Sequence, residues 1–257
     1  MSMINNREQT DAGNGSKAIH RVRNVLRPPS ADPMCSPNKP RPMPEDPNKK
    51  PTEGELLIRA GENATVDQHL KAKIASLFSA DANDFLWRAD VASQAEFQHR
   101  SWLGKIYVDY VMATECALKA AIIYLSPDSE SPRDAYRTAR SGSHDMQKLL
   151  PSAEERSRNI TPFVSKECVT FLSGLPFSVT ARYDLELLHA HFSTKDGYDS
   201  KVNDSIRDTD FMQRLRECAF EVVDFSRKTA KSGSNRSLPI LGTKMKAIQD
   251  AFTSFKL

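Results

Sequence analysis

Apolar residues recur every three or four positions from Leu103 to Leu125, and this stripe constrains the fold of the chain most strongly. The stripe continues for about six helical turns, which predicts one long helix with a single core-facing side. A capping pattern of Ser93 with Glu96 predicts where the helix begins. The helix should end before Pro127, because a proline disfavours helical geometry in the residue that precedes it.

Helical spacing recurs along the rest of the chain. Thr65 and Gln68 form a capping-box pattern ahead of an apolar stripe that starts at Val66. A second cap is expected at Ser143, with a helix that runs to Leu150 and is ended by Pro151. Further helices are expected over 133–139, after Thr161–Pro162, over 211–225 and over 241–255. Only 176–187 alternates like a strand, and no second strand pairs with it, so the fold class predicted is all-α.

The first part of the chain has a different composition. Nine of the 15 prolines fall between Pro28 and Pro51, with almost no large apolar residue. Such a segment buries too little surface to offset its ordering entropy. We therefore expect residues 1–60 to be a disordered, basic and Pro-rich arm, and 61–257 to be the helical domain. Within the arm, residues 17–27 carry four basic side chains and no acid, which suits either a solvated tail or contact with nucleic acid or an acidic partner.

Charge and hydropathy exclude few functional classes. The formal net charge of +3 over 257 residues does not demand a nucleic-acid partner. No apolar run approaches the roughly 20 residues of a membrane span, and the start of the chain has no apolar signal region. The expectation is a cytoplasmic protein without membrane contact. Cys35, Cys116, Cys168 and Cys218 form no C-x-x-C pair and are expected to be free thiols.

Three short motifs, in this order, resemble those of the HEPN superfamily. Met112–Tyr124 holds a Glu followed by a Leu-Lys pair, and Gly142–Leu150 is similar to the superfamily's His-Asp-Leu-x-x-Leu-Leu helix start. Arg182-Tyr183-Asp184 resembles its Arg-Tyr-Asp element. Ser143 and Met146 depart from the commonest neighbours. The resemblance covers about 93–188 and implies a HEPN-like helical bundle.

The resemblance also implies a function. HEPN domains often form homodimers and act on RNA in toxin–antitoxin, anti-phage or stress systems. Active members carry an Arg-x(4–6)-His motif and cut RNA without a metal, and here Arg182 with His189 and Arg137 with His144 have that spacing. A histidine can transfer a proton near neutral pH, and an arginine can stabilise charge on a phosphate. The attacking group would be the 2′-hydroxyl of the RNA itself.

Several readings stay open on these residues. Tyr183 and Thr138 stand where active members usually place a polar residue after the arginine. Arg182 therefore also suits a structural or interface ion pair, and His144 also suits hydrogen bonding at the start of a helix. Glu115 and Lys119 have the spacing of a stabilising helix pair, or of a buried polar pair at a dimer seam. No phosphate-binding glycine loop and no metal-ligand motif are present, so no cofactor and no metal are expected. The alternative to an RNA-associated protein is a non-catalytic module that binds a partner protein. A third hypothesis is a DNA-binding regulator that uses the basic arm.

Overall fold

The computed structural model describes residues 50, 52–94, 100–175, 204–233, 235–236 and 242–255. The chain divides into two compact units, Met1–Lys49 and Lys50–Leu257. The expected disorder of the arm and the strand-like stretch 176–187 lie outside the described residues. Everything below concerns the second unit by itself.

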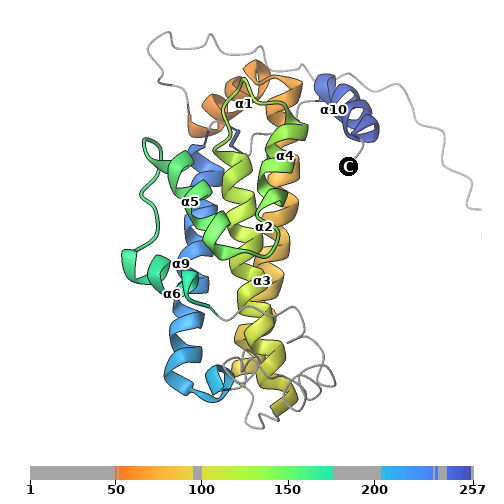
Figure 1. The fold of residues 1–257 in the computed structure, drawn as a ribbon. Helices are drawn as coiled ribbons and strands as arrows, with labels where there is room; N and C mark the ends of the chain where they lie inside the picture. The colour runs from red at the N-terminus through yellow and green to blue at the C-terminus, as the bar shows by residue number, and fades with distance from the viewer. Residues whose placement is uncertain are drawn as a thin grey trace, which may run out of the picture. The chain divides into compact units, whose positions relative to one another are not determined.

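The described part is helical throughout and contains no strand, which confirms the all-α class. Figure 1 shows the helices in order along the chain. Their bounds are α1 Glu53–Asn63, α2 Val66–Ser93, α3 Arg100–Tyr124, α4 Pro132–Ser141, α5 Met146–Ser157, α6 Lys166–Ser173, α9 Thr209–Ser232 and α10 Gly242–Ser254.

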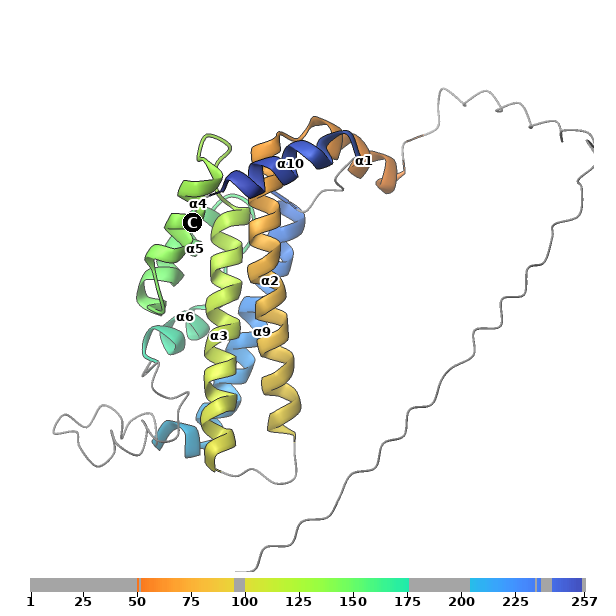
Figure 2. The ribbon, with the colours of Figure 1, turned by 90° about the vertical axis from the view of Figure 1, so that its right-hand side faces the viewer.

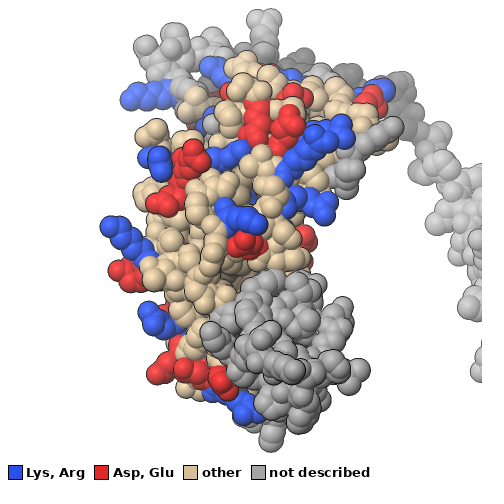
Figure 3. All heavy atoms as spheres, viewed as in Figure 1, with Lys and Arg blue, Asp and Glu red and all other residues tan. Residues whose placement is uncertain are grey.

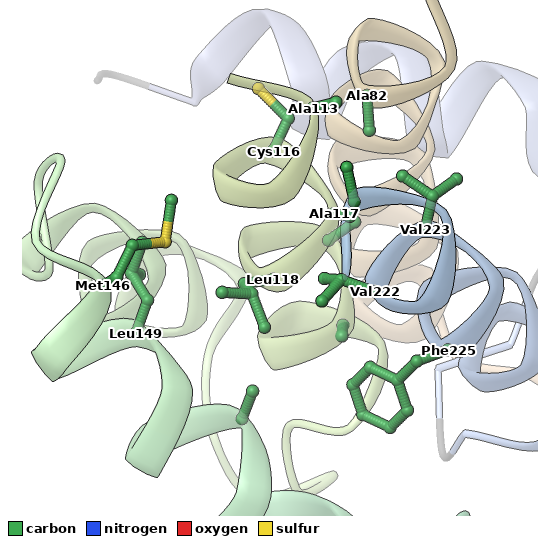
Figure 4. Close-up of a cluster of buried hydrophobic side chains, with 14 of the residues drawn as sticks. Ala82, Ala113, Cys116, Ala117, Leu118, Met146, Leu149, Val222, Val223 and Phe225 are labelled. Atoms are coloured by element: carbon green, nitrogen blue, oxygen red, sulfur yellow. The ribbon is translucent and has the colours of Figure 1, made fainter. Parts of the chain in front are cut away.

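Helix α3 is the centre of the unit. It packs along the whole of α2 and along α9, and it also contacts α4 and α5 (Figures 1 and 2). Small side chains let the three long helices approach each other: Ala82 of α2 lies beside Ala113 of α3, and Ala117 faces α9 (Figure 4). On the other side of α3, Leu118 lies toward Met146 and Leu149 of α5 (Figure 4). These residues are almost fully buried, so the apolar stripe seen in the sequence is the core of the molecule.

The helix that follows the Thr65–Gln68 cap is longer than expected. Thr65 and Gln68 do form a capping box, but α2 continues for 28 residues and ends at Ser93. The expectation that Ser93 opens the central helix is therefore wrong. The Ser93 hydroxyl instead donates to the Asp90 carbonyl one turn earlier, and α3 is helical from Arg100.

The helical part of the chain also starts earlier than residue 61. Thr52 and Glu55 form a second capping box, which begins α1 at Glu53. Packing contributes less to α1 than to α2, since Leu56 and Ile58 are about half exposed. The local cap therefore accounts for much of where α1 starts.

Three helix boundaries after the central helix differ from the expectations. Asp145, not Ser143, caps α5: its carboxylate accepts from the Gln147 backbone N–H. Pro151 lies inside α5 and does not end it, because the buried Leu149, Leu150 and Ala153 carry the helix on to Ser157. Helix α6 is capped by Ser165, four residues after the expected Thr161.

The loop after α9 is fixed against the end of α3. The Asn235 N–H donates to the Tyr124 carbonyl, and its side-chain amide donates to the Ser126 carbonyl at 2.6 Å. Gly233 makes this approach possible, because a Cβ there would lie 2.7 Å from the Tyr124 carbonyl oxygen. The loop is thus held by buried hydrogen bonds.

The surface and the thiols are unremarkable for a domain of this size. On the face shown in Figure 3, basic and acidic side chains of the described residues are interspersed. Cys116, Cys168 and Cys218 are buried and free, as expected, while Cys35 lies outside the described residues. Within the described ranges, no helix combines the length and the apolar character needed to cross a bilayer.

Candidate functional site

Glu115, Lys119 and His144 form a polar cluster at the junction of α3 with the segment between α4 and α5. Lys119 Nζ donates to Glu115 Oε1 at 2.5 Å, and His144 Nδ1 lies 2.7 Å from Glu115 Oε2. Both oxygens of the carboxylate are therefore engaged by nitrogen donors. The Glu115 side chain is 2% exposed, whereas that of His144 is 39% exposed. The cluster thus links a buried anion to a histidine that solvent can reach.

Glu115 and Lys119 lie in the core because α3 is covered on several sides. They are four residues apart on α3, and their neighbours Ala117, Leu118 and Ala120 are fully buried. A buried carboxylate is costly unless charged partners and hydrogen bonds compensate it. Lys119 and His144 provide that compensation. The Glu115–Lys119 pair is therefore more than an exposed helix pair.

A tight turn after α4 places His144 on Glu115. Gly142 is buried beside Leu149, and Ser143 adopts a left-handed backbone with φ of 49°. Asp145 then caps α5, so His144 lies directly before the cap of a new helix. The turn and the cap together set the direction of the imidazole.

This arrangement suits proton transfer. A carboxylate that accepts a hydrogen bond from Nδ1 orients the imidazole ring, as in the histidine–aspartate pairs of hydrolases. A neutral imidazole that donates from Nδ1 has Nε2 as its acceptor nitrogen. Such a ring could accept a proton from a substrate hydroxyl and release it later.

The structure does not bring Arg137 to this cluster. Arg137 is exposed on α4, two positions from each of the buried residues Ala135 and Ala139, and so on the opposite side of the helix. Its ion pair, at 3.8 Å, is with Asp134 one turn earlier. The described contacts place Arg137 against Asp134 and His144 against Glu115, not against each other. The expected Arg137–His144 pair is therefore not formed as a contact.

The second expected pair, Arg182 with His189, lies outside the described residues. Their pairing stays a prediction. In the described ranges, no group of three or more His, Cys, Asp and Glu side chains could hold a metal ion.

One functional link was not expected from the sequence. The spacing of Glu115 and Lys119 is visible in the chain, but their contact with His144 joins residues 29 positions apart. The available signal was a charged pair placed inside an otherwise apolar stretch of α3, where polar residues must find buried partners.

Comparison with protein families, with curated proteins and with solved structures finds no match for this chain. The functional argument therefore rests on the cluster and on the three short motifs.

Proposed function

We propose that this protein is an RNA-associated, HEPN-like helical protein that cleaves RNA without a metal, in a toxin–antitoxin or anti-phage system. The proposal rests on the contact of His144 with one carboxylate oxygen of the buried Glu115. Lys119 donates a hydrogen bond to the other oxygen of the same carboxylate. The three motifs of the sequence support the same family. A homodimer is part of this proposal.

In the proposed reaction, His144 accepts the proton of an RNA 2′-hydroxyl. The 2′-oxygen attacks the adjacent phosphorus, and the bond to the 5′-oxygen of the next nucleotide breaks. The leaving 5′-oxygen takes a proton from the protonated His144, and the products are a 2′,3′-cyclic phosphate and a 5′-hydroxyl. Glu115 keeps the imidazole oriented through each proton transfer. Arg182 remains the candidate for stabilising charge on the phosphate.

The test is cleavage of a single-stranded RNA by the full chain in the presence of EDTA. Replacing His144 with alanine should lower the rate by about 10²–10⁴-fold, the usual contribution of a general acid or base. Arg137→Gln is the matched control from the same region, and its rate should be unchanged because the side chain points away from the core. An active His144→Ala protein, with an unchanged melting temperature, would remove His144 from the reaction.

A non-catalytic interaction module is the second candidate. Leu56 and Ile58 of α1 are 52% and 47% exposed, and Met245 of α10 is 48% exposed. Exposed apolar side chains on two peripheral helices suit contact with another protein. RNA that stays intact at high protein concentration, together with a lower oligomeric state in a Leu56→Asp protein, would favour this candidate.

A further inference from the structure

Helices α2 and α9 pack against each other (Figures 1 and 2), and polar side chains join them. Arg216 Nε of α9 donates to Asp90 Oδ1 of α2 at 2.7 Å. Three turns further along α9, Arg227 Nε donates to Asn83 Oδ1 at 3.1 Å. These contacts define a continuous seam between the two helices on the surface of the unit.

A cavity opens at the α1 end of this seam. It has a volume of ≈ 790 Å³, and Glu53 and Leu56 of α1, Ser79 of α2 and Ala230 of α9 belong to its wall. Its basic side chains are Arg227, Lys231 and Arg236. The lining thus holds three cationic side chains against one carboxylate, and its size is in the range of small-molecule and nucleotide sites.

The three cations are available to an anion. Lys231 and Arg236 are exposed, and no ion pair among the described residues engages either of them or Arg227. Arg227 bonds to the neutral amide of Asn83, which orients the guanidinium without cancelling its charge. Arg236 follows Asn235, whose buried hydrogen bonds fix the loop. The guanidinium of Arg227 is therefore held in place before any ligand binds, and the backbone that carries Arg236 is fixed.

An exposed aromatic side chain lies further along α2, about two turns from the cavity residue Ser79. Trp87 is 68% exposed and lies one helical turn after Asn83, on the side of α2 that faces α9. Phe220, 38% exposed, lies on α9 along the same seam, under the guanidinium of Arg216. An indole ring that stays in water, one turn from the residue that orients Arg227, offers a flat surface for stacking.

Helix-end electrostatics account for only part of this arrangement. A basic residue in the last turn stabilises the negative end of a helix, which suffices for Lys231. It does not explain why Arg227 turns to an amide, why Arg236 is fixed beyond the helix, or why Trp87 is left exposed. Cations that follow a backbone, with aromatic rings between them, are the usual means of binding single-stranded nucleic acid.

We propose that the α2–α9 face, defined as Ser79, Asn83, Trp87, Arg227, Lys231 and Arg236, binds single-stranded RNA. The three cations contact phosphates, and a base stacks on Trp87. This inference rests on the proposed action on RNA and assigns it a binding surface separate from His144, since α5 and α9 lie on opposite sides of α3 (Figure 4).

The first test uses fluorescence anisotropy to measure binding of a fluorescein-labelled oligouridylate of 12 nucleotides to the full chain. Every protein tested carries His144→Ala, which prevents cleavage. Trp87→Ala should weaken binding about tenfold, within the range for loss of one stacked base. Trp102→Ala is the matched control, because Trp102 is 49% exposed on α3. Lys231→Gln with Arg236→Gln should weaken binding and reduce the salt slope by about 1.4. The paired control is Arg133→Gln with Lys246→Gln, two exposed cations of α4 and α10.

The second test detects stacking directly. Trp87 and Trp102 are the two tryptophans of the chain, so Trp102→Phe leaves Trp87 as the only one. Its emission should be quenched as the oligouridylate binds. Rising anisotropy with unchanged emission would overturn the stacking role.

The outcomes separate this inference from the proposed function. RNA that binds equally well to wild type and to all α2–α9 variants leaves RNA action intact and overturns the assignment of this face. Absence of RNA binding by every protein overturns both. A changed sedimentation coefficient in Trp87→Ala, with RNA affinity kept, would make the face a protein interface and also overturn the inference.

Discussion

At the scale of single residues, Lys119 is a buried cation whose charge is compensated by one buried carboxylate. It is 8% exposed and bonds to Glu115, which is 2% exposed. Replacing Lys119 with methionine keeps the volume but leaves a buried carboxylate with one charged partner fewer. We expect the free energy of unfolding to fall by about 3 kcal/mol, as when a buried pair loses one member.

Lys148 provides the control for this prediction. It pairs with Asp145 at 3.3 Å, and both side chains are largely exposed. Lys148→Met should change stability by less than about 1 kcal/mol, because surface pairs contribute little. Urea denaturation of the two variants measures the difference. Equal, small losses in both would mean that the Glu115 site tolerates its charge without Lys119.

Tyr124 at the end of α3 makes stability depend on alkaline pH. Burial raises the pKa of Tyr124 from 10.0 to about 12. Between these values the folded state holds a proton that the unfolded chain releases, so stability is lost as the pH rises from 10 to 12. The loss attributable to Tyr124 should reach about 2 kcal/mol at pH 12.

Comparison with Tyr124→Phe isolates this effect from other groups that titrate nearby. Burial also raises the pKa of Tyr110, and desolvation lowers the pKa of Lys71, which makes stability rise with pH below 10.5. The difference in unfolding free energy between wild type and Tyr124→Phe should be constant up to about pH 9.5 and then change in favour of the variant. A constant difference up to pH 12 would contradict the buried phenol.

At the scale of elements, the same cap should have different effects on two helices. Thr52 caps α1 and Thr65 caps α2, each in a capping box. Helix α2 packs on α3, α9, α4 and α10, whereas α1 exposes Leu56 and Ile58. Thr65→Ala should therefore lower global stability by about 1 kcal/mol. Thr52→Ala should leave global stability unchanged and increase amide exchange in α1 alone, because α1 can open locally. A loss of global stability in both would show that α1 unfolds only with the core.

The sequence predicts elements where local pattern and tertiary packing agree. The Thr65–Gln68 cap and the stripe of α9, which places Leu215, Ala219 and Val222 in the core, are local signals that packing reinforces. Ser93 matches a cap pattern, yet it is the last residue of α2. The burial of Leu86 and Ala89 stabilises α2 up to this point. Pro151 looked like a helix end, and only the burial of Leu150 and Ala153 explains why α5 continues.

Part of the candidate site can likewise be predicted from the sequence, and part depends on tertiary structure. The spacing of Glu115 and Lys119 and the position of His144 before a helix are readable along the chain. Their meeting depends on the turn at Gly142 and Ser143, whose left-handed backbone no periodic pattern predicts. The exposure of Trp87 depends on how α2 is rotated against α9. Both features belong to the assembled helices and not to any one segment.

At the scale of the whole molecule, positive and negative charges nearly balance, so RNA binding must depend on where individual charged side chains lie. The formal net charge is +3, and on the face shown in Figure 3 basic and acidic side chains of the described residues mix. Any attraction for RNA therefore depends on the local cluster of Arg227, Lys231 and Arg236 and not on the overall field. This distinguishes the α2–α9 face from the basic segment 17–27 as a source of affinity.

Removing the first unit separates the two sources. Residues Lys50–Leu257 form a compact unit with its own core, so a chain starting at Lys50 should unfold within about 0.5 kcal/mol of the full chain. Its affinity for the oligouridylate should also be kept, since the α2–α9 face is complete without residues 1–49. Denaturant unfolding and anisotropy on the same two proteins measure both. A large loss of RNA or DNA affinity with stability unchanged would instead favour nucleic-acid binding through residues 17–27, as the DNA-binding hypothesis requires.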